Sequence, residues 1–238
     1  MPLSLRNATV VVVGGTSGIG LEVARSASAA EARVIAVGRS EAHARAAQET
    51  LGERVTVRVL NIGDEYAVRS LFDPMTRVDH LVITAGKVGF GKIVETDMAT
   101  VRPLFDERFW GAYNVVRYAA PLIPPTGSIT LFSGNLAVKP TAGSSVVSAA
   151  VAAVEALGRA LAVELQPIRV NTVRSGAVET PLLRSRPDYQ DLATRLSLSL
   201  PVGRIGTPED LAHAVLFLMA NPYTTGTVLQ IDGGGLLA

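Results

Sequence analysis

A glycine-rich turn between a strand and a helix limits the folds open to this chain. The β-branched run 9–13 leads into Gly14-Gly15-Thr16-Ser17-Gly18-Ile19-Gly20, and a helix is expected to begin near Gly18. Gly14 permits a tight turn, Gly18 lets the backbone approach a pyrophosphate, and Gly20 lets the helix pack on the strand. This order predicts a phosphate-binding loop for a nucleotide, and the alternative is a glycine-rich turn without a ligand. The expected contacts come from Gly14, Thr16, Ser17, Gly18, Ile19 and Gly20.

Short β-branched runs alternate with Ala-rich stretches of helical length along the 238 residues. The alternation predicts one α/β domain over residues 1–238, with a doubly wound, seven-stranded parallel sheet between two layers of helices. The expected strands are 9–13, 33–37, 55–60, 80–84, 128–132, 169–173 and 227–231. The expected helices begin near Gly18, Glu41, Glu65, Val101, Ser144 and Pro208. The segment 176–201, which contains three prolines, is expected to be an irregular lid or substrate loop.

The composition argues against several classes of partner. The 22 Lys and Arg residues balance 21 Asp and Glu residues, so neither a nucleic acid nor an acidic membrane surface is expected. The longest apolar runs fall far short of the roughly 20 residues of a membrane span. The chain has no cysteine and no recognisable leader peptide, so we expect a cytoplasmic protein. Its histidines, His43, His80 and His213, have no metal-ligand spacing, and no metal is expected.

The end of the second expected strand bears on which nucleotide is bound. A site for NAD would carry an Asp or Glu here for the ribose 2′-hydroxyl, but the sequence is Gly38-Arg39-Ser40. A guanidinium binds a 2′-phosphate with paired, charged hydrogen bonds. Arg39 and Ser40 therefore favour NADP(H), unless Arg39 is only a solvated surface residue.

Further motifs make the chain resemble the short-chain dehydrogenase/reductase family over nearly its full length. They are the glycine loop, Asn61-Ile62, Thr84-Ala85-Gly86, Ile168-Arg169-Val170-Asn171 and Ile231-Asp232-Gly233-Gly234. The resemblance implies a Rossmann-type subunit, a nicotinamide dinucleotide, a small-molecule substrate and a homotetramer or homodimer. It also implies cofactor contacts from Asn61, Ile62, Ala85, Gly86, Val178 and Thr180.

The chain departs from that family at the catalytic positions. The family uses a Ser, a Tyr, a Lys four residues after the Tyr, and an upstream Asn. The resemblance puts Gly134, Val147, Val151 and Arg108 at these positions. The two valines carry no ionisable proton, and no Tyr or Lys occurs between Lys139 and Tyr189, so no small shift of the alignment restores the pair. The polar residues expected near the nicotinamide include Ser144, Ser145 and Ser148, and the candidate catalytic residues are Asp106, Arg108 and Ser133.

Three functions fit this pattern. The first is an NADP(H)-dependent oxidoreductase that reduces an iminium, or an activated carbonyl polarised by Arg108. The second is a non-catalytic, NADP(H)-binding pseudoenzyme or regulatory subunit, and the third is a non-redox use of the pocket. We favour the first because Thr180 and the substrate-loop segment are present. The segments 105–111 and 128–134 are similar to a divergent bacterial branch of the family. They are also similar to fungal imine-reducing members that lack the Tyr and Lys and carry an Arg.

Overall fold

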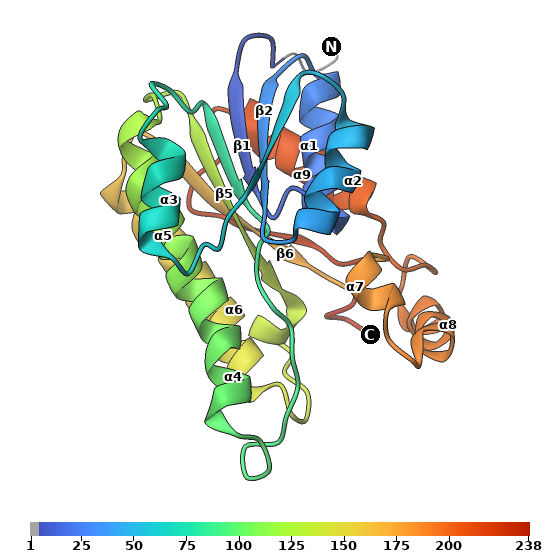
Figure 1. Cartoon of the computed structure of the whole chain (residues 1–238). Coiled ribbons are helices and arrows are strands. Elements are labelled where there is room, and N and C mark those ends of the chain that lie inside the picture. Colours follow the sequence, from blue (N-terminus) through green and yellow to red (C-terminus); the bar gives the residue numbers. More distant parts are fainter. Residues whose placement is uncertain (1–4) are drawn as a thin grey trace.

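The computed structural model describes residues 5–238, and its centre is one sheet of parallel strands (Figure 1). The strands are β1 (Thr9–Val13), β2 (Arg33–Gly38), β3 (Val55–Val59), β4 (His80–Ile83), β5 (Ser128–Gly134), β6 (Arg169–Ser175) and β7 (Val228–Ile231). Their order in the sheet is β3-β2-β1-β4-β5-β6-β7. The order reverses between β1 and β4, and the crevice at such a reversal is where sheets of this kind bind ligands. The predicted seven-stranded, doubly wound α/β fold is confirmed.

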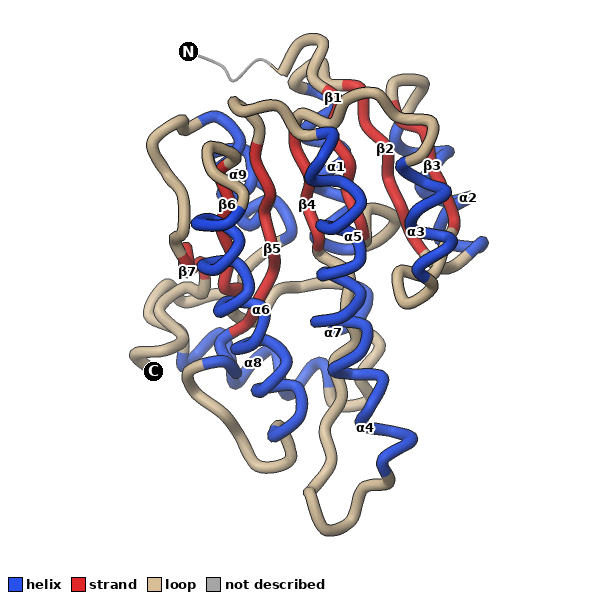
Figure 2. The backbone as a smooth tube through the Cα atoms, turned by 90° about the vertical axis from the view of Figure 1, so that its left-hand side faces the viewer, coloured by secondary structure: helices blue, strands red, loops and turns tan. Residues whose placement is uncertain are grey.

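Helices cover both faces of this sheet. They are α1 (Gly18–Ala29), α2 (Glu41–Leu51), α3 (Glu65–Phe72), α4 (Met98–Phe105), α5 (Gly111–Ala119), α6 (Ser145–Glu164), α7 (Pro181–Arg184), α8 (Tyr189–Ser199) and α9 (Pro208–Ala220). Helices α1, α2 and α9 lie on one face, and α3, α5 and α6 lie on the other (Figure 1 and Figure 2). A π-helical turn, η1 (Asp106–Trp110), joins α4 to α5 without a break. Helix α4 begins at Met98, earlier than the sequence predicted.

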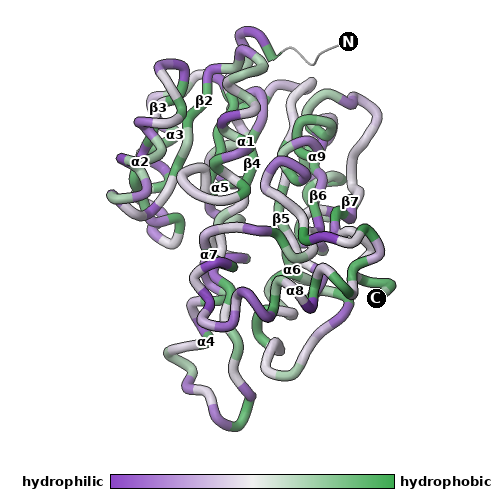
Figure 3. Tube along the Cα trace, turned by 90° about the vertical axis from the view of Figure 1, so that its right-hand side faces the viewer, coloured by the Kyte–Doolittle hydropathy of each residue, from purple (hydrophilic) through white to green (hydrophobic). Residues whose placement is uncertain are grey.

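The sheet has a hydrophobic core on each side. Along β1, Val10 and Val12 pack with α1 and α9, whereas Val11 and Val13 pack with α3, α5 and α6. Because successive side chains of a strand point to opposite faces, a strand covered on both sides needs apolar residues throughout. This requirement explains the β-branched runs in the sequence. Figure 3 shows hydrophobic residues gathered along the central strands.

One helix in the described part of the chain, α6, has the length and apolar composition that a membrane span requires. In the structure α6 lies against β5 and β6, and its inward side belongs to the core. Core helices of sheet proteins commonly show the same composition.

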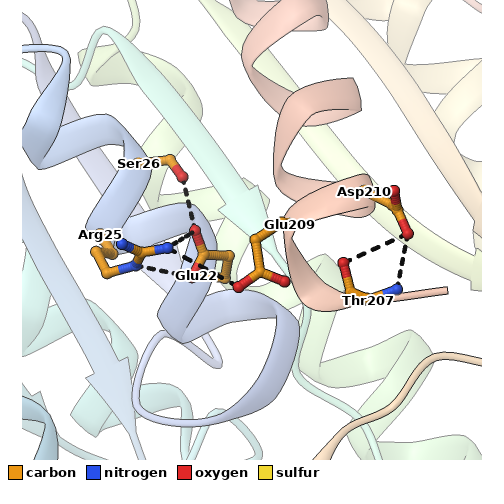
Figure 4. Close-up of polar contacts among 6 residues, drawn as sticks. All are labelled: Glu22, Arg25, Ser26, Thr207, Glu209 and Asp210. Atoms are coloured by element: carbon orange, nitrogen blue, oxygen red, sulfur yellow. Dashed lines mark hydrogen bonds and ion pairs between the residues drawn. The ribbon is translucent and has the colours of Figure 1, made fainter.

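Polar contacts connect α1 with α9 (Figure 4). Arg25 donates two hydrogen bonds to the Glu22 carboxylate, at 2.8 and 2.7 Å, and approaches Glu209 of α9 at 3.9 Å. Helix α9 begins with a capping box in which the Thr207 backbone N–H donates to Asp210 at 2.8 Å. Hydrogen bonds from Arg204, and then from the Thr207 backbone, lower the pKa of Asp210 to about 2. The predicted start of this helix at Pro208 is confirmed.

The segment 176–201 is more regular than the sequence suggested, because it contains α7 and α8. Pro181 stands at the first position of α7. A backbone N–H at this position would have no hydrogen-bond partner within the helix, so proline is well tolerated there. Pro187 falls between the two helices, and Pro201 follows α8. The prolines therefore delimit short helices, and the prediction of an irregular loop was wrong. Both helices lie beyond the carboxyl ends of the strands (Figure 1 and Figure 2).

Candidate functional site

The glycine turn after β1 has the backbone geometry that its sequence predicted. Gly14 and Gly18 have positive φ angles of 90° and 52°, which residues other than glycine rarely adopt. A Cβ at Gly20 would lie 2.2 Å from the Gly14 carbonyl oxygen, so α1 approaches the turn as closely as a backbone can. A Cβ at Gly18 would lie 3.3 Å from Thr180 Cγ2. The turn therefore faces the segment that leads into α7.

At the end of β2 an ion pair forms that the sequence did not suggest. Arg39, whose side chain is 56% exposed, places Nη1 2.7 Å from Glu107 Oε1. Lys87 Nζ lies 2.5 Å from the same oxygen. Arg39 follows β2, Lys87 follows β4 and Glu107 lies in η1. Only the three-dimensional fold brings these three residues together. No local pattern in the sequence could have paired them.

The neighbouring residues expected to contact the adenosine have local partners. Ser40 Oγ accepts a hydrogen bond from the His43 N–H at 3.3 Å and caps α2. Asn61 Oδ1 accepts the Gly63 N–H at 3.0 Å. Ile62 is buried under α5, where a Cβ at Gly111 would lie 2.7 Å from its Cδ1. Gly38 leaves room for Thr16, because a Cβ there would lie 2.0 Å from Thr16 Oγ1.

Arg108 is the least satisfied polar side chain at the site. Arg108 is 9% exposed, and its Nη2 donates one long hydrogen bond, of 3.3 Å, to the Lys87 carbonyl. Its Nε is buried with no partner in the described part of the chain. Burial lowers the pKa of Arg108 to about 10, against a smaller raising effect of Glu107. A desolvated cation with free donors favours an anionic or strongly polar ligand.

Two further features explain where this guanidinium lies. A Cβ at Gly86 would lie 2.8 Å from Arg108 Cζ, so the glycine after β4 provides the space for it. Glu107 is engaged by Arg39 and Lys87, and the partly exposed Asp106 forms no ion pair within residues 5–238. Arg108 therefore forms no ion pair with Asp106 or Glu107 at the helix surface within residues 5–238.

Ser133 has a different environment from the one expected. It is 3% exposed, and its hydroxyl donates to Glu155 Oε1 at 2.8 Å and approaches the Val151 carbonyl at 3.2 Å. Arg174 donates two hydrogen bonds of 2.8 Å to the same carboxylate. Burial alone would raise the pKa of Glu155, but the hydrogen bonds from Arg174 and Ser133 hold it below its ordinary value. Ser133 therefore points into a buried network, away from the polar lining in which it was expected.

The start of α6 buries the two valines that replace the expected catalytic pair. Val147 and Val151, which stand where the Tyr and Lys were expected, are 1% and 3% exposed. Ser144 is fully buried; its hydroxyl donates to the Thr141 carbonyl at 2.7 Å and lies 2.9 Å from Ser148 Oγ. Ser145 is exposed. The hydroxyl groups of Ser144 and Ser148 therefore stabilise the local turn.

Asn135, directly after β5, is a polar residue that the sequence reasoning missed. Its Nδ2 donates to Asp232 at 3.0 Å, and its Oδ1 is buried without a donor in the described chain. A sequence pattern gives no signal for it, since its partner comes from the segment after β7.

The segment between β6 and α7 lies against the glycine turn. Thr180 Oγ1 accepts the Leu183 N–H at 3.4 Å and caps α7, and Val178 is buried beside Gly206. Glu179 accepts a short hydrogen bond from the Tyr189 hydroxyl at the start of α8. That bond lowers the pKa of Glu179. Across residues 5–238, no three His, Asp or Glu side chains are grouped in a way that could hold a metal.

Known proteins resemble this chain along most of its length. A family model described as enoyl-(acyl carrier protein) reductase matches residues 13–235. The short-chain dehydrogenase/reductase malC of Malbranchea aurantiaca is 35% identical over 257 residues, which cover 98% of this chain and 96% of malC.

Two solved structures show the same fold. A small-chain dehydrogenase in complex with NADPH gives a TM-score of 0.82 at 36% identity, with 98% of this chain and 100% of that chain covered. The second is an NADPH-bound short chain oxidoreductase from Pseudomonas aeruginosa PAO1, described as containing an atypical catalytic center. It gives a TM-score of 0.91 at 30% identity, with 98% of each chain covered.

Proposed function

The chain belongs to the short-chain dehydrogenase/reductase family of oxidoreductases, and from this premise we propose that it is an NADP(H)-dependent reductase that works without the family's Tyr–Lys pair. The observation that carries the proposal is Arg108, a buried guanidinium with unfilled donors beside Gly86 at the end of β4. The proposed substrate is a small molecule with an imine-type or activated carbonyl group.

The cofactor fits the carboxyl edge of the sheet. The glycine turn has the backbone conformation of a phosphate-binding loop at the start of α1, where free backbone N–H groups and the helix dipole favour an anion. Arg39 and Lys87 provide cations for a 2′-phosphate. NADPH in the two structural neighbours supports this choice. The remaining proposed contacts are Thr16, Ser17, Ile19, Ser40, Asn61, Ile62, Ala85, Gly86, Val178 and Thr180.

When bound, the dinucleotide supplies a hydride. The chain contributes positioning, exclusion of water and electrostatics. Arg108 stabilises negative charge that develops on a carbonyl oxygen, or anchors an anionic group of the substrate. Val147 and Val151 are buried and apolar, and neither can donate a proton. An iminium accepts hydride without a proton donor, and this explains how a reductase can operate with these valines. We assign Ser133 to the fold, and Asp106 remains a candidate for contact with the substrate.

The test is a substrate screen with one variant. NADPH binding and NADPH oxidation are measured over ketones, quinones and cyclic imines, for the natural protein and for Arg108→Ala. Turnover of a confirmed substrate should fall by roughly 10- to 1,000-fold, the range for losing one electrostatic contact, with NADPH binding nearly unchanged. The pH profile of turnover by the natural protein should show no ionisation between about pH 6 and 9 other than that of the substrate, because the chain has no Tyr–Lys pair at the site to titrate.

Arg102→Ala is the matched control, since Arg102 is exposed on α4. Unchanged turnover in Arg108→Ala would remove this residue from the reaction. NADPH binding without turnover on every class would favour the pseudoenzyme.

The proposal includes a homodimer or homotetramer in the cytoplasm. Trp110 and Tyr113 are 52% and 42% exposed and lie edge to face, with ring centroids 5.9 Å apart. Phe109 continues the aromatic row 4.9 Å from Trp110. Exposed aromatic side chains that adjoin one another are typical of protein interfaces.

A further inference from the structure

Glu107 holds a carboxylate at the place where the proposed site needs positive charge. Its Oε1 contacts both Arg39 Nη1, at 2.7 Å, and Lys87 Nζ, at 2.5 Å. The Glu107 side chain is 20% exposed, so this carboxylate is mostly covered. Three segments of the chain thus bring two cations and one anion together at the carboxyl edge of the sheet.

The charges are not balanced within this cluster. The carboxylate cancels one of the two cations, and one positive charge is left for a ligand. Arg39 contacts Glu107 through Nη1 alone, and its half-exposed side chain is free to turn toward solvent. A phosphate dianion that binds Arg39 through paired hydrogen bonds must displace Glu107 from it or share it.

We propose that Glu107 limits the affinity of this protein for NADP(H) by competing with the 2′-phosphate for Arg39. The inference rests on the proposed binding of NADP(H). In the free protein Glu107 holds Arg39, and on binding the phosphate takes its place while Lys87 remains beside both anions. Cofactors without the 2′-phosphate leave the Arg39–Glu107 pair intact. Glu107 therefore reduces discrimination between NADPH and NADH.

The first test is Glu107→Gln, which keeps the shape of the side chain and removes its charge. Dissociation constants for NADPH and NADH are measured by titration of the cofactor-free protein. The constant for NADPH should fall about three- to tenfold, because the phosphate no longer competes with a carboxylate. The constant for NADH should change by less than about twofold. Glu95→Gln is the control, since Glu95 forms an exposed ion pair with Lys92 at 3.0 Å and should leave both constants unchanged.

A double-mutant cycle shows whether Arg39 mediates the effect. With Arg39→Gln already in place, Glu107→Gln should improve NADPH binding by less than about twofold. An improvement of full size in that background would overturn the proposal, because general charge repulsion would then explain it. Unchanged or weaker NADPH binding in Glu107→Gln alone would also overturn it. Weaker NADH binding would show instead that Glu107 accepts ribose hydroxyl groups.

Failure of the function and failure of this inference give different results. A natural protein that binds no NADPH refutes the proposed function. A natural protein that binds NADPH, with an unaltered constant in Glu107→Gln, refutes only the role of Glu107. Circular dichroism and melting temperature of each variant establish that it is folded.

Discussion

Two buried arginines of this protein differ in what satisfies them. Arg169 of β6 donates to the carbonyl oxygens of Leu218 and Met219, at 2.5 and 2.8 Å, near the end of α9. Cations at the end of a helix compensate its free carbonyl groups. Arg108 has one long hydrogen bond and a buried Nε without a partner in the described chain. Arg169 is satisfied by the fold itself, whereas Arg108 is not, and the proposed function assigns its open donors to a ligand.

This difference predicts opposite effects on stability. Arg108→Met keeps the stem of the side chain and removes a desolvated charge, so the free energy of unfolding of the cofactor-free protein should rise by about 1–3 kcal/mol. Arg108 is protonated in both the folded and the unfolded state below its lowered pKa of about 10, so the gain should be constant near neutral pH. Arg169→Met should be destabilising, because it leaves two carbonyl groups unpaired. Urea denaturation measures the free energy of unfolding of each variant, and an equal decrease in Arg108→Met and Arg169→Met would contradict the prediction.

His80 makes the stability of the fold depend on pH. Its Nδ1 lies 2.9 Å from Ser128 Oγ, and burial lowers the pKa of His80 to about 4. The unfolded chain binds a proton near pH 6.5, whereas the folded chain resists it down to about pH 4. Stability should therefore be fully present above about pH 6.5 and should fall by about 3 kcal/mol as the pH drops to 4.

The measurement is urea denaturation at pH 7, 5.5 and 4. His80→Asn should remove most of the slope between pH 7 and 4, and His43→Asn, at an exposed position on α2, should keep it. A slope that survives in His80→Asn would assign the pH dependence to other groups.

At the scale of elements, the Glu155 network fastens α6 to the sheet. The carboxylate is reached by Ser133 of β5 and by Arg174 of β6, so one side chain connects three elements. Glu155→Gln should lower the free energy of unfolding by about 3 kcal/mol, because Arg174 is left without its charged partner in a poorly hydrated place. Chemical denaturation at pH 7 tests this, with Glu164→Gln at the exposed end of α6 as the control. Equal stability of the two variants would count against the network.

The sequence predicted the elements well where local rules decide them. β1 and the starts of α1, α2, α3 and α9 lie where the β-branched runs, the Ala-rich stretches and the glycine turn placed them. Helices α7 and α8 were missed because their prolines were interpreted as interruptions. The contacts of Glu107 and Ser133 could not be predicted, because each partner comes from a distant segment. The expected cofactor and substrate contacts remain predictions.

For the whole molecule, the exposed aromatic row on η1 and α5 predicts self-association. Light scattering at micromolar concentration should give a mass of two or four chains of 24.9 kDa each. Trp110→Glu should shift the mass toward a single chain, because a carboxylate is costly to bury in an interface. Tyr66→Glu is the control, since Tyr66 is 82% exposed on α3. A single-chain mass for the natural protein would refute the prediction.

The π-helical turn η1 changes what a mutation of chain length would do here. The Gly111 N–H donates to the Asp106 carbonyl, so this turn spans one more residue than an α-helical turn. Because the wider turn holds one extra residue in about the rotation of an α-helical turn, it keeps α4 and α5 in the relative orientation of one regular helix. Deleting one residue between 106 and 110 should therefore restore α-helical spacing while both helices keep the faces that they turn to the sheet. Only the residues within the turn, Arg108 among them, would be displaced, so a change of one residue in chain length would move this side chain and leave the two helices in place.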